Sequence, residues 1–295
     1  PNPATGGGIH PGAPEICNGV DDNCNGQIDE GTGGSNRTWT GATSTDWNTA
    51  SNWSCGGVPL ATEDVIIPNV ANDPVIMGGT AAIARSVRVN SGVSLTVSAA
   101  GSLTINGATS QGIVNYGTLT NNGTISIGAT ASGNPYSGIT NVGTFNNNTG
   151  SEIGIDRVVF VGIDNQGTFS NAGEITLGAV AYAGADGIKN LATFNNNAGG
   201  DIRIDRSGNN ALYNRGLFAN AAKITIGAVA SVGDKGILTF APIPGDIATF
   251  INNVGGEIRI DRVITSSIGI GTGLYNGGSF TNDAKIIIGG GSSIY

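Results

Sequence analysis

The residues with the clearest capacity for chemistry lie between positions 15 and 30. They read Glu-Ile-Cys-Asn-Gly-Val-Asp-Asp-Asn-Cys-Asn-Gly-Gln-Ile-Asp-Glu. Asp21, Asn23 and Asn25 are spaced by two residues, and Gly26 then permits a sharp turn. In calcium loops of the EF-hand type, oxygens at alternate positions of the loop converge on one cation. The spacing therefore predicts a calcium-binding loop.

The predicted calcium ligands are all oxygen atoms, which favour a hard ion such as Ca²⁺. Gln27 would contribute its backbone carbonyl, and Asp29 would bind directly or through a water molecule. Thr32 stands where such loops carry their last, bidentate Glu, so Glu30 or Glu15 must complete the shell. The predicted ligand set is Asp21, Asn23, Asn25, Gln27, Asp29 and Glu30.

The three cysteines bear on this loop. Cys17 and Cys24 bracket its first half, and we expect them to form a disulfide in an oxidising compartment. Cys55 is then left over, either free or paired outside this chain. Two alternatives stay open: a soft metal if the cysteines are reduced, and a disulfide-stapled turn that binds no metal.

Composition excludes several classes of function. The formal net charge of −8 disfavours nucleic acids and anionic membrane surfaces. No stretch approaches the roughly 20 apolar residues of a membrane-spanning helix, so we expect no membrane insertion. His10 is the only histidine and lies in a Pro- and Gly-rich segment, so a Ser-His-Asp or Cys-His catalytic set cannot form. We expect the protein not to be an enzyme.

The rest of the chain must position these residues, and from about residue 112 it repeats itself every 24 to 26 residues. Residues 112–119, Gly-Ile-Val-Asn-Tyr-Gly-Thr-Leu, return at 138–145 as Gly-Ile-Thr-Asn-Val-Gly-Thr-Phe. Each copy also holds a short alternating run such as Ile125-Ser-Ile127, which is typical of a strand. A repeat of this length with short strands and no helical period indicates a solenoid. We predict an all-β fold, a right-handed parallel β-helix.

Stacked coils place equivalent residues in ladders. One predicted ladder fills the interior with large apolar side chains: Leu119, Phe145, Phe169, Phe194, Phe218, Phe250 and Phe280. A second is a ladder of amides that bond between coils: Asn115, Asn141, Asn165, Asn190, Asn214 and Asn276.

Every second coil ends its Ile triplet with Asp-Arg, at 156–157, 205–206 and 261–262, so the full repeat spans two coils. A unique cluster is needed for an active site, and these pairs recur, so we interpret them as surface ion pairs. The position before each triplet forms a charged row: Thr124, Glu152, Glu174, Asp201, Lys223, Glu257 and Lys285. Opposite neighbours in such a row stabilise it, and Glu152 beside Glu174 leaves a cation site there as a weaker hypothesis.

We predict four segments. Residues 1–14 form a linker, and 15–34 form the disulfide-stapled calcium-binding motif. Residues 35–60, which hold all three Trp, cover the open end of the core, and 61–295 form the β-helix, which we expect to continue beyond the chain end. Insertions near 240–244 and 265–272 should be loops on one face.

Residues 15–30 resemble a metal-binding motif repeat of large secreted bacterial proteins, of the form Glu-x-Cys-Asn-Gly-x-Asp-Asp-Asn-Cys-Asn-Gly-x-Ile-Asp-Glu. The Trp-rich stretch and the strands after it look like segments of giant adhesin-like bacterial surface proteins. Both resemblances imply an exported, extracellular or cell-surface protein, and neither implies a reaction.

These expectations combine into a structural or adhesive rod with a calcium-stabilised joint, part of a large secreted surface or appendage protein. Its expected partners are further copies or neighbouring subunits in a homo-oligomeric assembly, with glycans or cell surfaces as other targets. The alternative is a carbohydrate-binding or polysaccharide-cleaving β-helix, in which the two insertions wall a groove.

Overall fold

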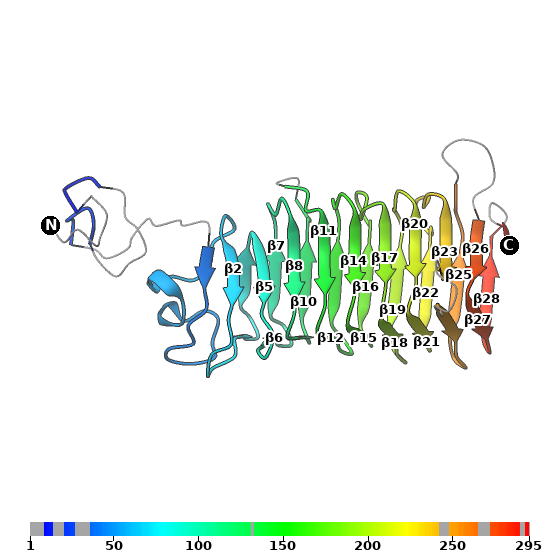
Figure 1. Ribbon diagram of the computed structural model, residues 1–295, viewed down its shortest axis with the longest axis horizontal. Helices are drawn as coiled ribbons and strands as arrows, with labels where there is room; N and C mark the ends of the chain where they lie inside the picture. Colours follow the sequence, from blue (N-terminus) through cyan, green and yellow to red (C-terminus); the bar gives the residue numbers. More distant parts are fainter. Residues whose placement is uncertain are drawn as a thin grey trace.

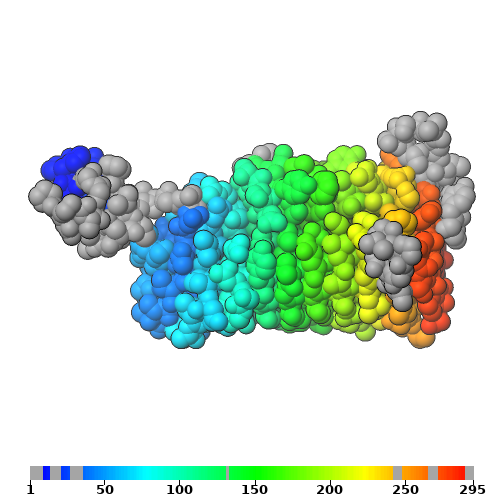
Figure 2. Space-filling view, viewed as in Figure 1, coloured from blue at the N-terminus to red at the C-terminus, as the bar shows by residue number. Residues whose placement is uncertain are grey.

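The computed structural model describes residues 9–13, 21–26, 36–130, 133–241, 248–264, 272–289 and 293–294. Within them the chain is a parallel β-solenoid of about 10 turns, which confirms the predicted all-β architecture. The coils follow one another along the long axis of the molecule (Figures 1 and 2). Helical structure among these residues is limited to two 3₁₀ turns, η1 (Ala50–Asn52) and η2 (Ser54–Gly56).

Three parallel sheets form the walls, and each coil contributes one strand to each sheet in turn (Figure 1). Sheet 1 contains β1 (Asn36–Thr38), β2 (Asp64–Ile67), β5 (Ser86–Val89), β8 (Gln111–Asn115), β11 (Ser137–Asn141), β14 (Val161–Asn165), β17 (Asp186–Asn190), β20 (Asn210–Asn214), β23 (Lys235–Phe240), β26 (Thr272–Gly277) and β29 (Ser293–Ile294). Sheet 2 contains β3 (Val75–Ile76), β6 (Ser94–Val97), β9 (Thr118–Asn121), β12 (Thr144–Asn147), β15 (Thr168–Asn171), β18 (Thr193–Asn196), β21 (Leu217–Asn220), β24 (Thr249–Asn252) and β27 (Ser279–Asn282). Sheet 3 contains β4 (Ala81–Ala84), β7 (Ser102–Ile105), β10 (Thr124–Ile127), β13 (Glu152–Ile155), β16 (Glu174–Leu177), β19 (Asp201–Ile204), β22 (Lys223–Ile226), β25 (Glu257–Ile260) and β28 (Lys285–Ile288).

The predicted aromatic ladder is confirmed. Phe145 pairs with Leu119 on one side and Phe169 on the other, in register along sheet 2. From Phe145 to Phe280, successive ring centroids lie 4.6–5.1 Å apart with interplanar angles of 4–9°. Offset or parallel stacking at this spacing adds to the free energy gained from burying the rings. The stack therefore holds the register of neighbouring coils.

The predicted Asn ladder in sheet 1 is also confirmed. Asn165 is fully buried, accepts a hydrogen bond from Asn141 Nδ2 at 2.9 Å and donates its own Nδ2 to Asn190 Oδ1 at 2.8 Å. Because a buried amide without partners is costly, this chain of bonds fixes each coil against the next. The ladder is interrupted in the coil that contains β23, where Thr239 pairs with Asn214 and Asn276.

A second Asn ladder ends the strands of sheet 2, and the sequence analysis missed it. Its amides are linked by Nδ2 to Oδ1 distances of 2.7–2.8 Å. The signal was present, because an Asn stands two residues after each inner Leu or Phe of the aromatic ladder. Its members are Asn121, Asn147, Asn171, Asn196, Asn220, Asn252 and Asn282.

The N-terminal end of the solenoid holds the three tryptophans. Trp39, Trp47 and Trp53 are buried, with edge-to-face ring contacts at centroid distances of 4.9 and 4.6 Å, and they are continuous with the apolar core. Near this end, Arg37 of β1 and Glu63 form a buried ion pair, with Nη2 and Oε1 2.6 Å apart. Among the helices of the described residues, none has the length and apolar character needed to cross a membrane.

Candidate functional site

The described part of the predicted metal loop curls around the carboxylate of Asp21. Asp21 Oδ2 accepts a hydrogen bond from the backbone N of Gly26 at 2.8 Å, and its Oδ1 accepts one from Asn25 N at 3.2 Å. Asn23 Oδ1 accepts a bond from the same Asn25 N at 3.0 Å. Gly26 adopts a φ of +91°, a conformation that favours glycine, so the sharp turn predicted there is confirmed.

Residues before the motif lie against this turn. His10 N donates to Asp22 O at 2.9 Å, and Gly12 N donates to Asn23 O at 3.4 Å. His10 Nδ1 lies 3.2 Å from Pro11 O, a local contact in an exposed position. The backbone around His10 therefore helps to shape the loop.

Three of the six predicted ligands, Asp21, Asn23 and Asn25, thus lie within one turn, and their oxygens suit a hard cation. Gln27, Asp29 and Glu30, together with Cys17 and Glu15, lie outside the described residues. Within the part that the structure describes, no group of three or more His, Cys, Asp or Glu side chains is arranged to hold a metal ion. The described residues therefore bring three predicted ligands into one turn, where the Asp21 and Asn23 oxygens accept backbone amides.

The predicted pairing of Cys24 with Cys17 is wrong. Cys24 is an exposed, free thiol at a backbone φ of 58°. Cys55, by contrast, is disulfide-bonded, so the expectation that it is the cysteine left over is wrong as well. The turn places the Cys24 side chain in solvent.

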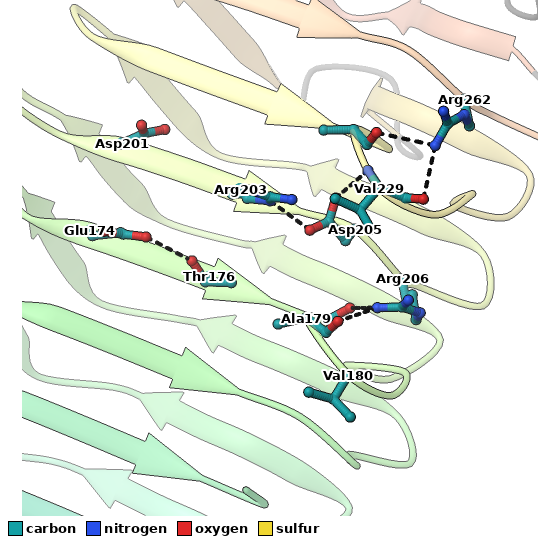
Figure 3. Close-up of polar contacts among 12 residues, drawn as sticks. Glu174, Thr176, Ala179, Val180, Asp201, Arg203, Asp205, Arg206, Val229 and Arg262 are labelled. Carbon is teal, nitrogen blue, oxygen red and sulfur yellow. Dashed lines mark hydrogen bonds and ion pairs between the residues drawn. The ribbon is translucent and has the colours of Figure 1, made fainter.

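The repeated Asp residues do not pair with the Arg residues that follow them. Asp205 Oδ1 accepts a hydrogen bond from the backbone N of Val229, in the next coil, at 3.0 Å (Figure 3). Asp156 Oδ1 accepts two such bonds, from Val180 N at 2.9 Å and Ala181 N at 3.0 Å. Asp156 and Asp205 therefore hold the loop of the coil that follows.

The Arg residues hold the loop of the coil that precedes. Arg206 Nη1 donates to Gly178 O at 2.8 Å and also to Ala179 O (Figure 3). Arg157 makes the same bonds to Gly128 and Ala129. Arg262 bonds one residue further along its loop, to Ala228 and Val229. The Asp-Arg pairs are therefore clamps between coils, and their interpretation as surface ion pairs with each other is corrected.

Two of the repeated Asp residues form an ion pair with the Arg that stands two residues before them, at the end of the same strand. Arg203 Nε lies 2.6 Å from Asp205 Oδ2, and Arg259 Nε lies 2.8 Å from Asp261 Oδ2. Asp205 is thus satisfied on both oxygens although its side chain is only 2% exposed. A buried carboxylate needs this pairing to offset its desolvation.

These clamps explain why the repeat spans two coils. The clamped coils begin their loops with Gly-Ala, and Gly178 has a φ of +72°. A Cβ at Gly178 would lie 2.4 Å from Arg206 O, so the close approach requires glycine. Asp-Arg coils and Gly-Ala coils must alternate because each kind supplies what the other accepts.

The charged row on sheet 3 lies in register as predicted. Lys223 Nζ is 2.8 Å from Asp201 Oδ2, and Lys285 Nζ is 3.5 Å from Glu257 Oε2. Glu152 and Glu174 are direct neighbours, but the described residues around them form no cluster of three metal-binding side chains. The cation site that we considered there has no structural support.

Comparisons with known protein families match two parts of the chain. Residues 8–30 match a family model described as "Putative metal-binding motif", whose short name refers to copper. Residues 38–152 match a domain of unknown function, DUF8693. Each model covers less than half of the chain. Neither the curated proteins nor the solved structures include a significant match.

Proposed function

We propose that this chain is a stiff structural segment of a large secreted or cell-surface protein, with adhesion as its wider role. The observation that carries the proposal is the unbroken register of three parallel sheets around two Asn ladders and a stacked Phe row. Repeating contacts between every pair of coils resist bending, because each coil is fixed to its neighbours at several points. A right-handed winding fits the strong preference of crossovers between parallel strands.

The N-terminal loop is proposed to bind Ca²⁺ through Asp21, Asn23, Asn25, Gln27, Asp29 and Glu30. One support is the turn around Asp21, whose carboxylate accepts hydrogen bonds from the backbone N–H groups of Gly26 and Asn25. The other is the match to a metal-binding motif. The exposed thiol of Cys24 makes a soft ion such as Cu⁺ the competing occupant.

Calorimetric titration separates these two occupants. Ca²⁺ should bind the wild-type chain and raise its melting temperature relative to chelator, and Asp21→Ala should abolish both effects. Cys24→Ser is the matched control and should leave Ca²⁺ binding intact. If Cu⁺ binds, Ca²⁺ does not, and Cys24→Ser removes the binding, the calcium assignment is wrong.

We propose no catalytic function. The repeated Asp and Arg side chains are committed to backbone groups of adjacent coils, and the single histidine, His10, makes a local contact with Pro11 O in an exposed position. An extracellular or cell-surface location agrees with the disulfide at Cys55, since such bonds persist in oxidising compartments.

The proposed rod is tested by small-angle scattering and analytical ultracentrifugation of the full chain. A rigid, elongated particle is expected, and higher oligomers are expected if the rod assembles with copies of itself. Scattering typical of a flexible chain would exclude the rod. A second candidate, binding of glycans, is favoured by one specific surface, described next.

A further inference from the structure

One edge of the solenoid gathers exposed apolar side chains. This edge, which we call the 3–1 edge, consists of the loops that lead from sheet 3 into sheet 1, and it lies along the top of Figure 1. Val180 is 67% exposed and Tyr182 is 57% exposed. The exposed apolar residues of the edge are Tyr136, Val159, Phe160, Val180, Tyr182, Val229 and Ile264. Exposed apolar residues that gather on one edge mark interaction sites on soluble proteins.

The backbone beneath these side chains is held by the Asp-Arg clamps. Asp156 bonds to the amide of Val180, and Arg157 bonds to the carbonyls of the preceding loop. Tyr136 and Phe160 stack on each other, with ring centroids 4.8 Å apart and an interplanar angle of 12°. A surface fixed in this way loses little conformational entropy when it binds a ligand.

A shallow, open groove of about 430 Å³ lies within this edge. The described residues that line it are Asn134, Arg157, Val158, Val159, Ala181 and Tyr182. Arg157 uses only Nη1 for its clamp, so Nε and Nη2 have no hydrogen bond within the described part of the chain. Its φ of 54° lies in the left-handed region, a strained state that often accompanies functional sites.

The chemistry of this groove suits a sugar. An aromatic ring can cover the apolar C–H face of a pyranose, while Arg157 and Asn134 can hydrogen-bond its hydroxyl groups. No carboxylate is among the described lining residues, and the net charge of −8 repels polyanions. We propose that the groove binds a neutral polysaccharide chain that lies along the 3–1 edge.

The dimensions of the edge favour a linear polymer over a protein partner. The apolar side chains run from Tyr136, just before β11, to Ile264, which follows β25, and the loop before β20 contributes none. Their span is roughly 25 Å at the usual strand spacing. The strip is one loop wide, which is narrow for a protein partner, because a stable protein interface buries about 800 Å² on each side. This inference rests on the adhesive part of the proposed function and names its ligand class.

Affinity electrophoresis and calorimetry of the full chain test the inference. The probes are neutral polysaccharides (mixed-linkage β-glucan, galactomannan and amylose) and acidic ones (alginate and polygalacturonate). At least one neutral probe should bind, and Tyr182→Ala should weaken that binding more than about tenfold, as expected for an aromatic anchor. Tyr275→Ala, which truncates an exposed tyrosine on β26, is the matched control and should bind as wild type.

Several outcomes would overturn the inference. Among them are no binding of the wild-type chain to any neutral probe, and equal losses in Tyr182→Ala and Tyr275→Ala when circular dichroism shows both folded. A dimer in sedimentation that Tyr182→Ala disrupts would show instead that a second copy covers this edge. None of these results bears on calcium binding or on the rod, so a failed glycan site is distinguishable from a failed structural role.

Discussion

Oδ1 of Asp205 accepts a hydrogen bond from the backbone N of Val229 at 3.0 Å, although 24 residues separate the two in the sequence. The bond joins a coil to the loop of the coil after it, and Asp156 makes the same bond to Val180 at 2.9 Å. A carboxylate that accepts a backbone amide satisfies a group that the sheets leave unpaired. The clamp therefore lets the loops of the 3–1 edge pack closely without losing hydrogen bonds.

Removal of this carboxylate should destabilise the solenoid. Asp205→Ala leaves the amide of Val229 and the guanidinium of Arg203 without their partner, and we expect a loss of about 1–3 kcal/mol in the free energy of unfolding. Denaturant unfolding followed by circular dichroism measures it. Asp283→Ala, at an exposed position, is the control and should change stability by less than about 0.5 kcal/mol. Equal losses in both variants would contradict the clamp.

The close approach at Gly178 makes a second prediction. Gly178→Ala introduces a Cβ 2.4 Å from Arg206 O at a φ of +72°, and we expect it to lower the unfolding free energy by more than about 1 kcal/mol. Gly154→Ala in β13 is the matched control, because its Cβ would meet no atom within 4 Å. That control should be neutral or stabilise by about 0.5–1 kcal/mol. The melting temperatures of the two variants test this prediction. A Gly178→Ala variant that melts at the wild-type temperature would contradict the tight packing.

The interrupted Asn ladder offers a stabilising substitution. Thr239 is fully buried, and its Oγ1 has no hydrogen-bond partner within the described residues. Thr239→Asn should restore the amide chain between Asn214 and Asn276 and raise stability by about 0.5–1.5 kcal/mol. The melting temperature should rise. Asn165→Ala removes an amide from the intact part of the ladder and should lower the melting temperature. A lower melting temperature in both variants would show that the extra volume of Asn does not fit at position 239.

The parts of this fold that the sequence predicted are those in which a side chain meets its own copy. Phe169 stacks on Phe194, and Asn165 bonds to Asn190. A residue that recurs at the same position of each repeat therefore identifies both partners of the contact. The second Asn ladder follows the same rule and was available to the same reasoning.

The clamps could not be predicted in this way, because their acceptors and donors are backbone atoms. The amino-acid sequence alone does not show that Arg206 donates to the carbonyls of Gly178 and Ala179. The recurrence of Asp-Arg in every second coil indicated a two-coil repeat. The reason for this alternation became clear only from the geometry of the loops. Likewise, the pairing of Cys24 depends on the direction of one turn, which residue spacing does not determine.

Asp186 predicts a dependence of stability on pH. Burial raises the pKa of Asp186 above its ordinary value of 3.8, against the opposing hydrogen bonds from Asn210, and the charges of Lys189 and Asp164 contribute smaller effects. The folded state therefore binds this proton more tightly than the unfolded state, and the stability it adds is lost as pH rises through the raised pKa. Asp186→Asn keeps an oxygen that can accept from Asn210.

This variant should therefore melt at a higher temperature than wild type at pH 7, and the difference should shrink as pH falls below 3.8. Melting curves of both proteins from pH 3 to pH 8 measure the effect. Asp283→Asn, at an exposed position, serves as the control for a general loss of surface charge. A gain that persists unchanged at pH 3 would contradict the assignment to Asp186.

The cysteine arrangement makes the last prediction. Cys24 is exposed and free whereas Cys55 is disulfide-bonded, so iodoacetamide without reductant should label Cys24 and leave Cys55 unmodified. Tandem mass spectrometry of the digested protein locates the label, and reduction before labelling should expose all three cysteines of the chain. Ca²⁺ should leave the rate of labelling unchanged, because a hard ion does not coordinate the thiol, whereas protection by Cu⁺ would indicate a thiolate ligand. Labelling of Cys55 in place of Cys24 would restore the pairing that residue spacing alone suggests.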